Sequence, residues 1–120
     1  VRVVHELFSA AMWQLFDNAS KYALKDTDIN IEADIDTEPK KLMISMVSVS
    51  IDEDEEERIF LENYRGRNVG NSDGTGIGMF IARKALKLMK ASISVKNNGF
   101  SCEMAGIRYS RHTFTIQFDS

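Results

Sequence analysis

The sequence of 120 residues is poor in several residue types, and each shortage excludes a class of protein. Its single cysteine, Cys102, can form neither an internal disulfide nor a multi-cysteine zinc site, and it suits a reducing compartment. Proline occurs once, and no apolar run approaches the roughly 18–20 residues that a membrane-spanning helix needs. The N-terminal segment lacks the small-residue cleavage site of a secretory signal. The sequence as a whole has 43% hydrophobic and 28% charged residues, which is typical of a globular protein.

Length and the first residue bear on domain organisation. A chain of 120 residues is enough for one small domain and leaves little room for a second. The sequence begins at Val1 and not at methionine, which favours a piece of a longer protein. We therefore expect residues 1–120 to form one domain, a fragment of a larger chain.

Glycine and acidic residues are unevenly distributed. Of only seven glycines, five lie between positions 66 and 78. Six of the 18 acidic residues are consecutive, from Asp52 to Glu57, which leaves 12 acidic against 15 basic residues elsewhere. The net charge of −3 is therefore a local property of the acidic run, and it argues neither for nor against an anionic ligand.

Hydrophobic periodicity predicts the elements of the first half of the chain. Apolar residues three and four positions apart predict an amphipathic helix over 4–23. Alternation predicts a half-buried strand over 29–35 and a more apolar, central strand over 42–51. The acidic run is expected to form the solvated first turn of a helix that reaches residue 63, and a loop is expected over 64–74.

A second amphipathic helix is predicted over 77–90, followed by strands over 91–98 and 111–118 around an irregular excursion. The residues of that helix expected to share one side are Ile77, Phe80, Ile81, Ala85, Leu88 and Met89. Trp13 and the six methionines are expected in the core. The order of elements predicts an α/β fold, a two-layer sandwich in which helices cover one face of a mixed sheet.

The glycine-rich segment Gly74-Thr75-Gly76-Ile77-Gly78 lies where a polar loop enters the second predicted helix. Glycine lets a ligand approach the backbone closely, and the unpaired N–H groups of a helix start favour a phosphate. A structural turn explains the same residues equally well. The segment is no Walker loop, because no Gly-Lys-Ser/Thr follows, and no Rossmann fingerprint, because a polar loop precedes it.

The first predicted helix carries Gln14, Asn18, Lys21 and Tyr22 on one stripe. An asparagine on an otherwise apolar face is costly to bury unless its amide has partners. In one interpretation it bonds to a neighbouring strand. In the other its oxygen binds Mg²⁺, which takes few protein oxygens together with phosphate oxygens and water, and Lys21 faces the same phosphates.

Two long segments resemble the sensor histidine kinases. WQLFDNASKYA (13–23) is similar to their N box, and RIFLENYRGRNVGNSDGTGIGMFIARK (58–84) is similar to their phenylalanine-containing box, ATP lid and second glycine box. The resemblance covers nearly the whole chain and implies the Bergerat ATP-binding fold of the gyrase-type ATPases. It implies a protein-histidine kinase catalytic domain, which positions Mg·ATP for phosphoryl transfer to a histidine on a separate dimerisation domain.

The resemblance also implies cofactors and site residues, position by position. The cofactors would be ATP and Mg²⁺, with the metal on Asn18, a phosphate on Lys21 and the nucleotide beside Tyr22. Arg65 and Arg67 would belong to the lid, and Ile59 and Phe60 would pack its root. The lid end and phosphate site would be shaped by Gly74, Thr75, Gly76, Ile77 and Gly78.

The partners that the resemblance implies lie outside the chain. They are the dimerisation domain of the same protein, which carries the phosphoacceptor histidine, and a response regulator; no nucleic acid is expected. No catalytic residue is therefore expected within the chain. The expected location is the cytoplasm, and the resemblance is compatible with a homodimeric, membrane-anchored parent.

The pattern breaks at the family's first glycine box, Asp-x-Gly-x-Gly-Ile. Counting back from Ile59 places that box on residues 46–51, where Met46 replaces the aspartate that reads the adenine amino group, and Ser48 and Ser50 replace both glycines. Losing one hydrogen bond to a buried carboxylate costs about 1.5–3 kcal/mol, or roughly 10- to 150-fold in affinity. These three residues form the candidate adenine pocket, in which a serine hydroxyl would read the base through water.

Two alternatives to the kinase domain stay open. One is a degenerate, non-catalytic module that keeps the fold for regulation or protein binding. The other is a serine/threonine kinase of the anti-sigma type. Gln14 stands where hydrolytic relatives place a glutamate, and an amide is no general base, so water-directed ATP hydrolysis is not expected. His5 is expected at the surface, and His112 has no predicted partner.

Overall fold

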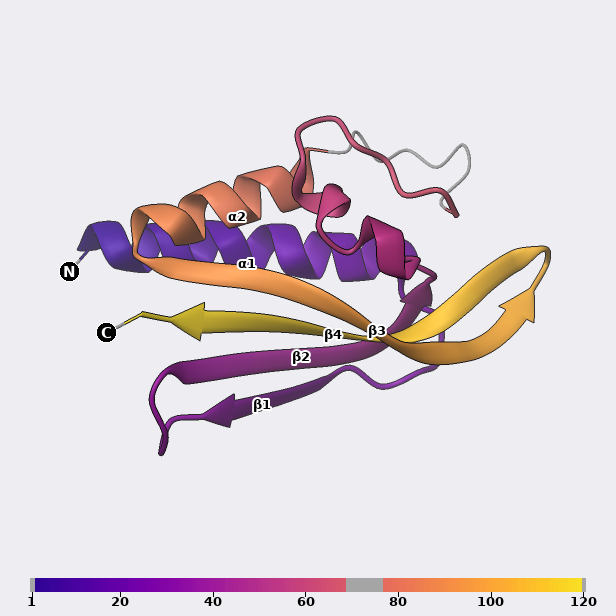
Figure 1. Ribbon diagram of the computed structural model, residues 1–120, viewed down its shortest axis with the longest axis horizontal. Coiled ribbons are helices and arrows are strands. Elements are labelled where there is room, and N and C mark those ends of the chain that lie inside the picture. The colour runs from indigo at the N-terminus through magenta and orange to yellow at the C-terminus, as the bar shows by residue number, and fades with distance from the viewer. Residues whose placement is uncertain (1, 69–76, 120) are drawn as a thin grey trace.

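The computed structural model describes residues 2–68 and 77–119. Its elements are, in chain order, α1 (Arg2–Tyr22), β1 (Asn30–Asp34), β2 (Lys40–Val49), two short 3₁₀ helices η1 (Glu53–Glu55) and η2 (Arg58–Phe60), α2 (Gly78–Leu88), β3 (Ala91–Met104) and β4 (Ile107–Phe118). Both α-helices lie on the same face of the sheet (Figure 1). The predicted two-layer α/β architecture is confirmed.

The four strands form one sheet in the order β1-β2-β4-β3. Every neighbouring pair is antiparallel, so the expectation of a mixed sheet was wrong. The reason is topological. Two hairpins, β1–β2 and β3–β4, are joined through α2, and β4 returns beside β2, so no two parallel strands become neighbours. The prediction that residues 42–51 form a central strand is confirmed, because β2 is paired on both sides.

The segment expected to be an irregular excursion is instead the end of a long hairpin. β3 and β4 stay paired as far as Met104 and Ile107, and Ala105 and Gly106 turn the chain with φ angles of 51° and 79°. Positive φ at both central residues is typical of two-residue hairpin turns. The end of this hairpin projects beyond the rest of the sheet (Figure 1), and Phe100 and Met104 are exposed there. Without a buried face, these residues show no alternation that sequence analysis could detect.

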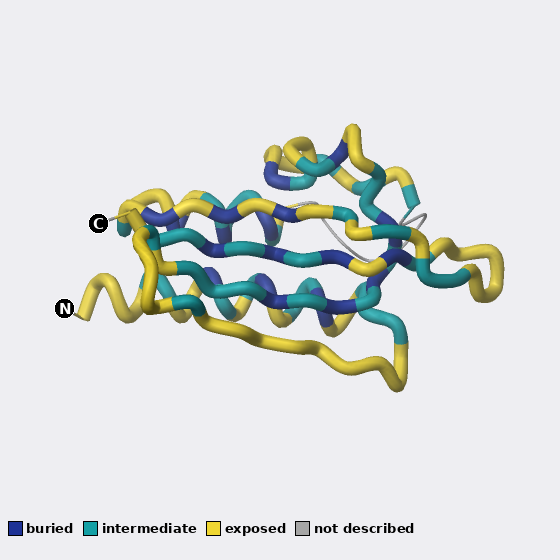
Figure 2. The backbone as a smooth tube through the Cα atoms, turned by 60° about the horizontal axis from the view of Figure 1, so that its bottom comes forward, coloured by how far each residue is buried: buried dark blue, intermediate teal, exposed yellow. Residues whose placement is uncertain are grey.

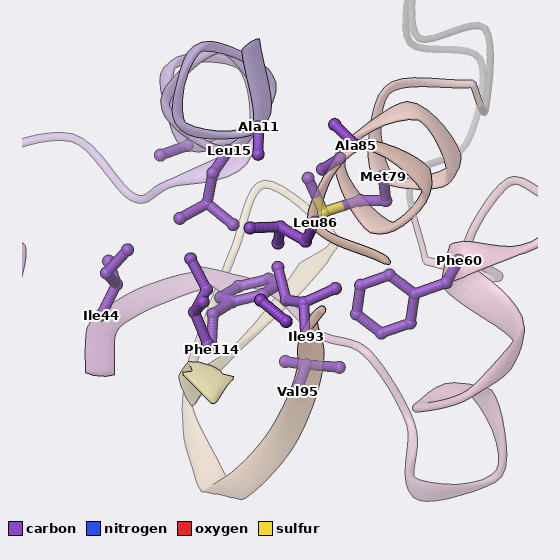
Figure 3. Packing of buried hydrophobic residues seen from close by; sticks show 14 of the residues in the cluster. Ala11, Leu15, Ile44, Phe60, Met79, Ala85, Leu86, Ile93, Val95 and Phe114 are labelled. Carbon is purple, nitrogen blue, oxygen red and sulfur yellow. The ribbon is translucent and has the colours of Figure 1, made fainter. Parts of the chain in front are cut away.

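The core lies between the helices and the sheet (Figure 3). Its largest members include Leu15 of α1, Leu86 of α2, and Ile44, Phe114 and Ile116 of the sheet. Burying such side chains stabilises the fold by about 1.5–3 kcal/mol each. The helices also bury small residues, which let their backbones pack closely: Ala11 and Ala19 of α1, and Ala82 and Ala85 of α2.

The side of α2 on which apolar residues were predicted to gather is not the side that is buried, apart from Ala85. The buried residues are Met79, Ala82, Ala85 and Leu86, whereas Leu88 is 70% exposed. The helix offers apolar residues on more than one side, and the face with two alanines is the one that packs closely. The core expectation was also wrong for Trp13, 70% exposed, and for Met104, while Met46 and Met79 are buried as expected.

β1 is exposed instead of half-buried. It lies at the edge of the sheet beyond β2, and Figure 2 shows it exposed along nearly its whole length. Ile31, which alternation would assign to a buried face, is 53% exposed. Alternation therefore predicted the strand correctly and its environment incorrectly.

Candidate functional site

A cavity of about 140 Å³ lies between the C-terminal half of α1, the end of β2, the segment around η2 and the start of α2. Seven of the predicted ligand-binding residues line it: Asn18, Lys21, Tyr22, Ser48, Arg65, Ile77 and Gly78. They come from four segments that are far apart in the sequence. Gly74, Thr75 and Gly76 lie outside the described residues.

The α1 wall of the cavity is polar because Gln14, Asn18 and Lys21 follow one another at helical spacing. The Lys21 ammonium forms an ion pair with the Asp17 carboxylate at 3.2 Å, and both side chains are a little under half exposed. Exposed pairs of this kind contribute little to stability, so Lys21 can exchange this partner for an anionic ligand at small cost.

The start of α2 approaches α1 very closely at the cavity. A Cβ atom added to Gly78 would lie 3.0 Å from Gln14 Oε1. Glycine at this position therefore lets the first N–H groups of α2 sit beside the polar wall of α1. A helix N-terminus carries partial positive charge and unpaired donors, which suits phosphate.

The β2 side of the cavity is formed by Ser48, Val49 and Ile51, with Ile59 of η2. Ser48 Oγ lies 2.8 Å from His112 Nδ1, and His112 Nε2 accepts a hydrogen bond from the Ile51 N–H at 3.0 Å. His112 is 1% exposed, and burial lowers the pKa of its imidazole. The histidine without a predicted partner thus holds the end of β2 against β4.

Alternation along the last strand contained the signal for the burial of His112. It shares the parity of Phe114 and Ile116, so it lies on the face of β4 that packs on the helices. Its two hydrogen bonds depend on cross-strand register, which the sequence alone does not provide. His5, in contrast, is exposed as expected.

Two of the three candidate adenine-pocket residues lie outside the cavity lining. Met46 is 4% exposed and belongs to the hydrophobic core. Ser50 is also buried, and its hydroxyl pairs with that of Ser110 at 2.8 Å. Ser48 alone of the three contacts the cavity. Among the described lining residues the only carboxylate is Asp17, on the α1 wall, so the β2 side carries none.

Arg67 also lies outside the cavity lining. Its guanidinium bonds to Asp52 at 2.9 Å and to Asp54 at 2.8 Å. These contacts hold the pKa of the Asp54 carboxyl below its usual value and raise the pKa of Arg67. The structure therefore separates the two arginines that the resemblance assigns to a lid: Arg65 lines the cavity, and Arg67 bonds to the acidic run.

The acidic run has a buried member, contrary to the expectation of a solvated helical turn. The helix expected over 54–63 is replaced by η1 and η2, and Glu55 of η1 is fully buried. Its carboxylate accepts hydrogen bonds from the Tyr64 hydroxyl at 2.7 Å, the Arg67 N–H at 2.7 Å and the Asp52 N–H at 3.2 Å. The bond to Glu55 raises the pKa of Tyr64. Glu55 thereby positions Tyr64, which lines the cavity.

The donor set of the cavity fits Mg²⁺ only in company with phosphate. Within residues 2–68 and 77–119, no group of three or more His, Cys, Asp or Glu side chains could hold a metal ion. The Asn18 amide, with Asp17 beside it, supplies few oxygens. Mg²⁺ in phosphate sites usually has one or two protein ligands, and phosphate oxygens and water complete its octahedron.

Several other lining residues, among them Asp17, Val49 and Tyr64, were not predicted as site residues. Asp17 is adjacent to Asn18 in the sequence, and Val49 follows Ser48 near the end of the predicted strand. Both could have been predicted from their neighbours. Tyr64 could not, because its place depends on the buried Glu55. None of the helices in the described part of the chain is long and apolar enough to cross a bilayer.

Comparison with known proteins identifies relatives by family and by structure. The family of histidine kinase-, DNA gyrase B-, and HSP90-like ATPases matches residues 4–119. The mycobacterial sensor histidine kinase MprB is similar in structure, with a TM-score of 0.67 and 17% identity over 92% of this chain and 69% of that one. The catalytic domain of the histidine kinase ThkA has a TM-score of 0.61 and 20% identity over 96% of this chain and 69% of its own.

A larger protein, full-length ShkA in complex with AMPPNP, is matched over 95% of this chain but only 22% of its own length, with a TM-score of 0.58 and 15% identity. At these identities the likeness shows the fold. No curated protein matches the sequence.

Proposed function

Because the chain belongs to the family of histidine kinase-, DNA gyrase B-, and HSP90-like ATPases, we propose that it is the ATP-binding catalytic domain of a two-component sensor histidine kinase. It would hold Mg·ATP and present the γ-phosphate to a histidine on a separate dimerisation domain. The observation that carries this proposal is the meeting of Asn18, Lys21 and the start of α2 around one cavity.

The phosphates and the base of the nucleotide would bind to two different walls of the cavity. Lys21 and the first N–H groups of α2 would bind phosphate oxygens, and Asn18 would bind Mg²⁺ through its amide oxygen. The bound metal would supply electrostatic stabilisation of the phosphate charge. Val49, Ile51 and Ile59 offer an apolar wall to the flat faces of a purine. Phosphoryl transfer depends mainly on such positioning and electrostatics.

The nature of residue 14 favours transfer to a protein over hydrolysis. Gln14 lines the cavity, where a general base would have to lie to activate water. A side-chain amide does not take up a proton near neutral pH, so it cannot serve. The nucleophile that attacks the γ-phosphate would then come from another domain. Within this proposal the partners are the dimerisation domain and a response regulator, and the domain works in the cytoplasm of a homodimeric, membrane-anchored parent.

Binding is tested by thermal unfolding of the chain with and without Mg·ATP. A ligand present at 100 times its Kd stabilises the native state by about 2.7 kcal/mol, which shifts the Tm of a domain of this size by several degrees. Asn18→Ala should reduce this shift strongly. Asn30→Ala, an exposed change on β1, which contributes no residue to the cavity lining, should keep it. The absence of any shift at millimolar Mg·ATP would overturn the proposal.

Phosphoryl transfer needs a second assay, since the acceptor lies outside the chain. Mixing the chain with a separately produced histidine-bearing dimerisation domain and γ-labelled ATP should place label on that domain only. Acid-labile, alkali-stable label identifies phosphohistidine, whereas acid-stable label on a protein partner would indicate a serine/threonine kinase.

A non-catalytic module is the second candidate, and one observation favours it. The position that should read adenine is Met46, which is buried in the core, and the β2 side of the described cavity has no carboxylate. A folded chain that shows no melting shift with any nucleotide would support this candidate.

A further inference from the structure

The hydrogen-bonding character of the β2 wall follows from the protonation of His112. The Ile51 N–H points at His112 Nε2 at 3.0 Å, so this nitrogen carries a lone pair and no proton. A neutral imidazole has one N–H, which must then be on Nδ1. That N–H donates to Ser48 Oγ at 2.8 Å. The Ser48 oxygen is therefore an acceptor toward His112.

The Ser48 hydroxyl consequently keeps its own proton for another partner. A hydroxyl has one donor and two acceptor sites, and His112 occupies one of the acceptor sites. Among the described residues, Ser48 forms no further side-chain hydrogen bond. Ser48 lines the cavity next to Val49 and Ile51, on the side suited to a purine. A ligand there meets a group that can both donate and accept.

We propose that Ser48, positioned by His112, reads position 6 of the purine, so that the cavity binds 6-oxo and 6-amino purine nucleotides with similar affinity. This inference rests on the function proposed above and concerns the specificity of the same site. A carboxylate accepts only, so it favours an amino group and repels a carbonyl oxygen. A hydroxyl can donate to a 6-oxo group or to adenine N1, and it can accept from a 6-amino group with its remaining lone pair.

The test compares ATP with inosine 5′-triphosphate, which differs from it only at positions 1 and 6 of the ring. Calorimetric titration of the chain with the two Mg²⁺ complexes, and with Mg·tripolyphosphate as a probe without a base, separates base from phosphate recognition. We expect the Kd values of the two nucleotides to lie within about tenfold of one another, because hydrogen bonds between neutral groups have similar free energies whether Ser48 donates or accepts. Both nucleotides should bind more tightly than tripolyphosphate.

Variants at position 48 assign the effect to one side chain. Ser48→Ala should weaken both nucleotides by about three- to tenfold and leave tripolyphosphate unchanged. Ser45→Ala is the matched control on the same strand, because Ser45 bonds to Thr113, 3.0 Å away, and does not line the cavity. Ser48→Asp, which makes the wall an acceptor, should raise the ratio of ATP to inosine triphosphate affinity above about tenfold.

Each contrary result has a distinct meaning. A preference of the unaltered chain for ATP above about tenfold would overturn the specificity inference while leaving the proposed function intact. Nucleotides that bind no better than tripolyphosphate would overturn it as well, since no base would then be read. An unchanged ratio in Ser48→Asp would show that Ser48 does not face the base. Failure of all three probes to bind would overturn both proposals together.

Discussion

His112 holds its place in the sheet only as a neutral ring. Its Nε2 accepts from the Ile51 N–H, and it is almost completely buried. Burial lowers the pKa of His112, and this is the largest influence on it. In the unfolded chain a histidine has a pKa of about 6.5. Stability from this residue is therefore complete above about pH 6.5 and falls as the pH drops toward the lower pKa of the folded state.

We predict a loss of unfolding free energy from this residue of up to about 1.4 kcal/mol per pH unit below pH 6.5. Urea unfolding at intervals between pH 8 and pH 5.5 measures it. His112→Gln should flatten this part of the profile, whatever its effect at pH 8. His5→Gln, at the exposed histidine of α1, should retain the acid loss. An unchanged slope in His112→Gln would contradict the prediction.

At the scale of single residues, the polar wall of α1 was more predictable from the sequence than the β2 wall. Asn18, Lys21 and Tyr22 lie on one cavity because helical spacing places them together whatever the rest of the fold does. Met46 and Ser48 share one face of β2 and Ser50 follows its end, yet of the three only Ser48 reaches the cavity. Which of them does so depends on His112 and Ser110 of the neighbouring strand, and that pairing is a tertiary property.

At the scale of elements, the buried Glu55 connects η1 to the segment that follows η2. Three donors converge on its carboxylate: the Tyr64 hydroxyl and the N–H groups of Asp52 and Arg67. Glu55→Gln keeps the shape but replaces one acceptor oxygen with an NH₂ group, which cannot accept. We predict a loss of about 1–3 kcal/mol in unfolding free energy, the cost of a buried group left unsatisfied.

Equilibrium urea unfolding at pH 7 measures the cost of Glu55→Gln. Glu53→Gln is the matched control, because Glu53 belongs to the same short helix and is exposed. The control should change stability by no more than about 0.5 kcal/mol. Equal effects of the two substitutions would contradict a structural role for the buried carboxylate.

The same element shows why local patterns fail in part. A run of six acidic residues suggests a solvated helical turn on composition alone, since carboxylates are rarely fully buried without partners. Two of the three partners of Glu55, Tyr64 and Arg67, lie 9 and 12 positions later in a segment without periodicity. Strong local patterns, as in α1 and β2, predicted their elements well. Burial of α2, β1 and the hairpin end depended on what packs against them.

At the scale of the whole molecule, the sheet has a protected middle and an exposed edge. β4 is paired on both sides, by β2 and β3, and buries Phe114 and Ile116 under the helices. β1 is paired on one side only, and four of its five residues are exposed. Segments with few buried contacts open locally at a small fraction of the global free energy of unfolding.

We therefore predict a gradient of amide exchange across the sheet. Amides of β4 from Thr113 to Ile116 should exchange only through global unfolding, so their exchange should slow in step with any stabilising condition. Amides of Asn30–Asp34 should exchange orders of magnitude faster, because they open with β1 alone. Their exchange rates should not change with small changes in global stability. Hydrogen exchange followed by mass spectrometry or NMR measures both, and Glu55→Gln supplies the perturbation: it should accelerate exchange in β4 and leave β1 unaltered. Equal protection of the two strands would show that β1 opens only with the entire sheet, and that its exposed position does not weaken it.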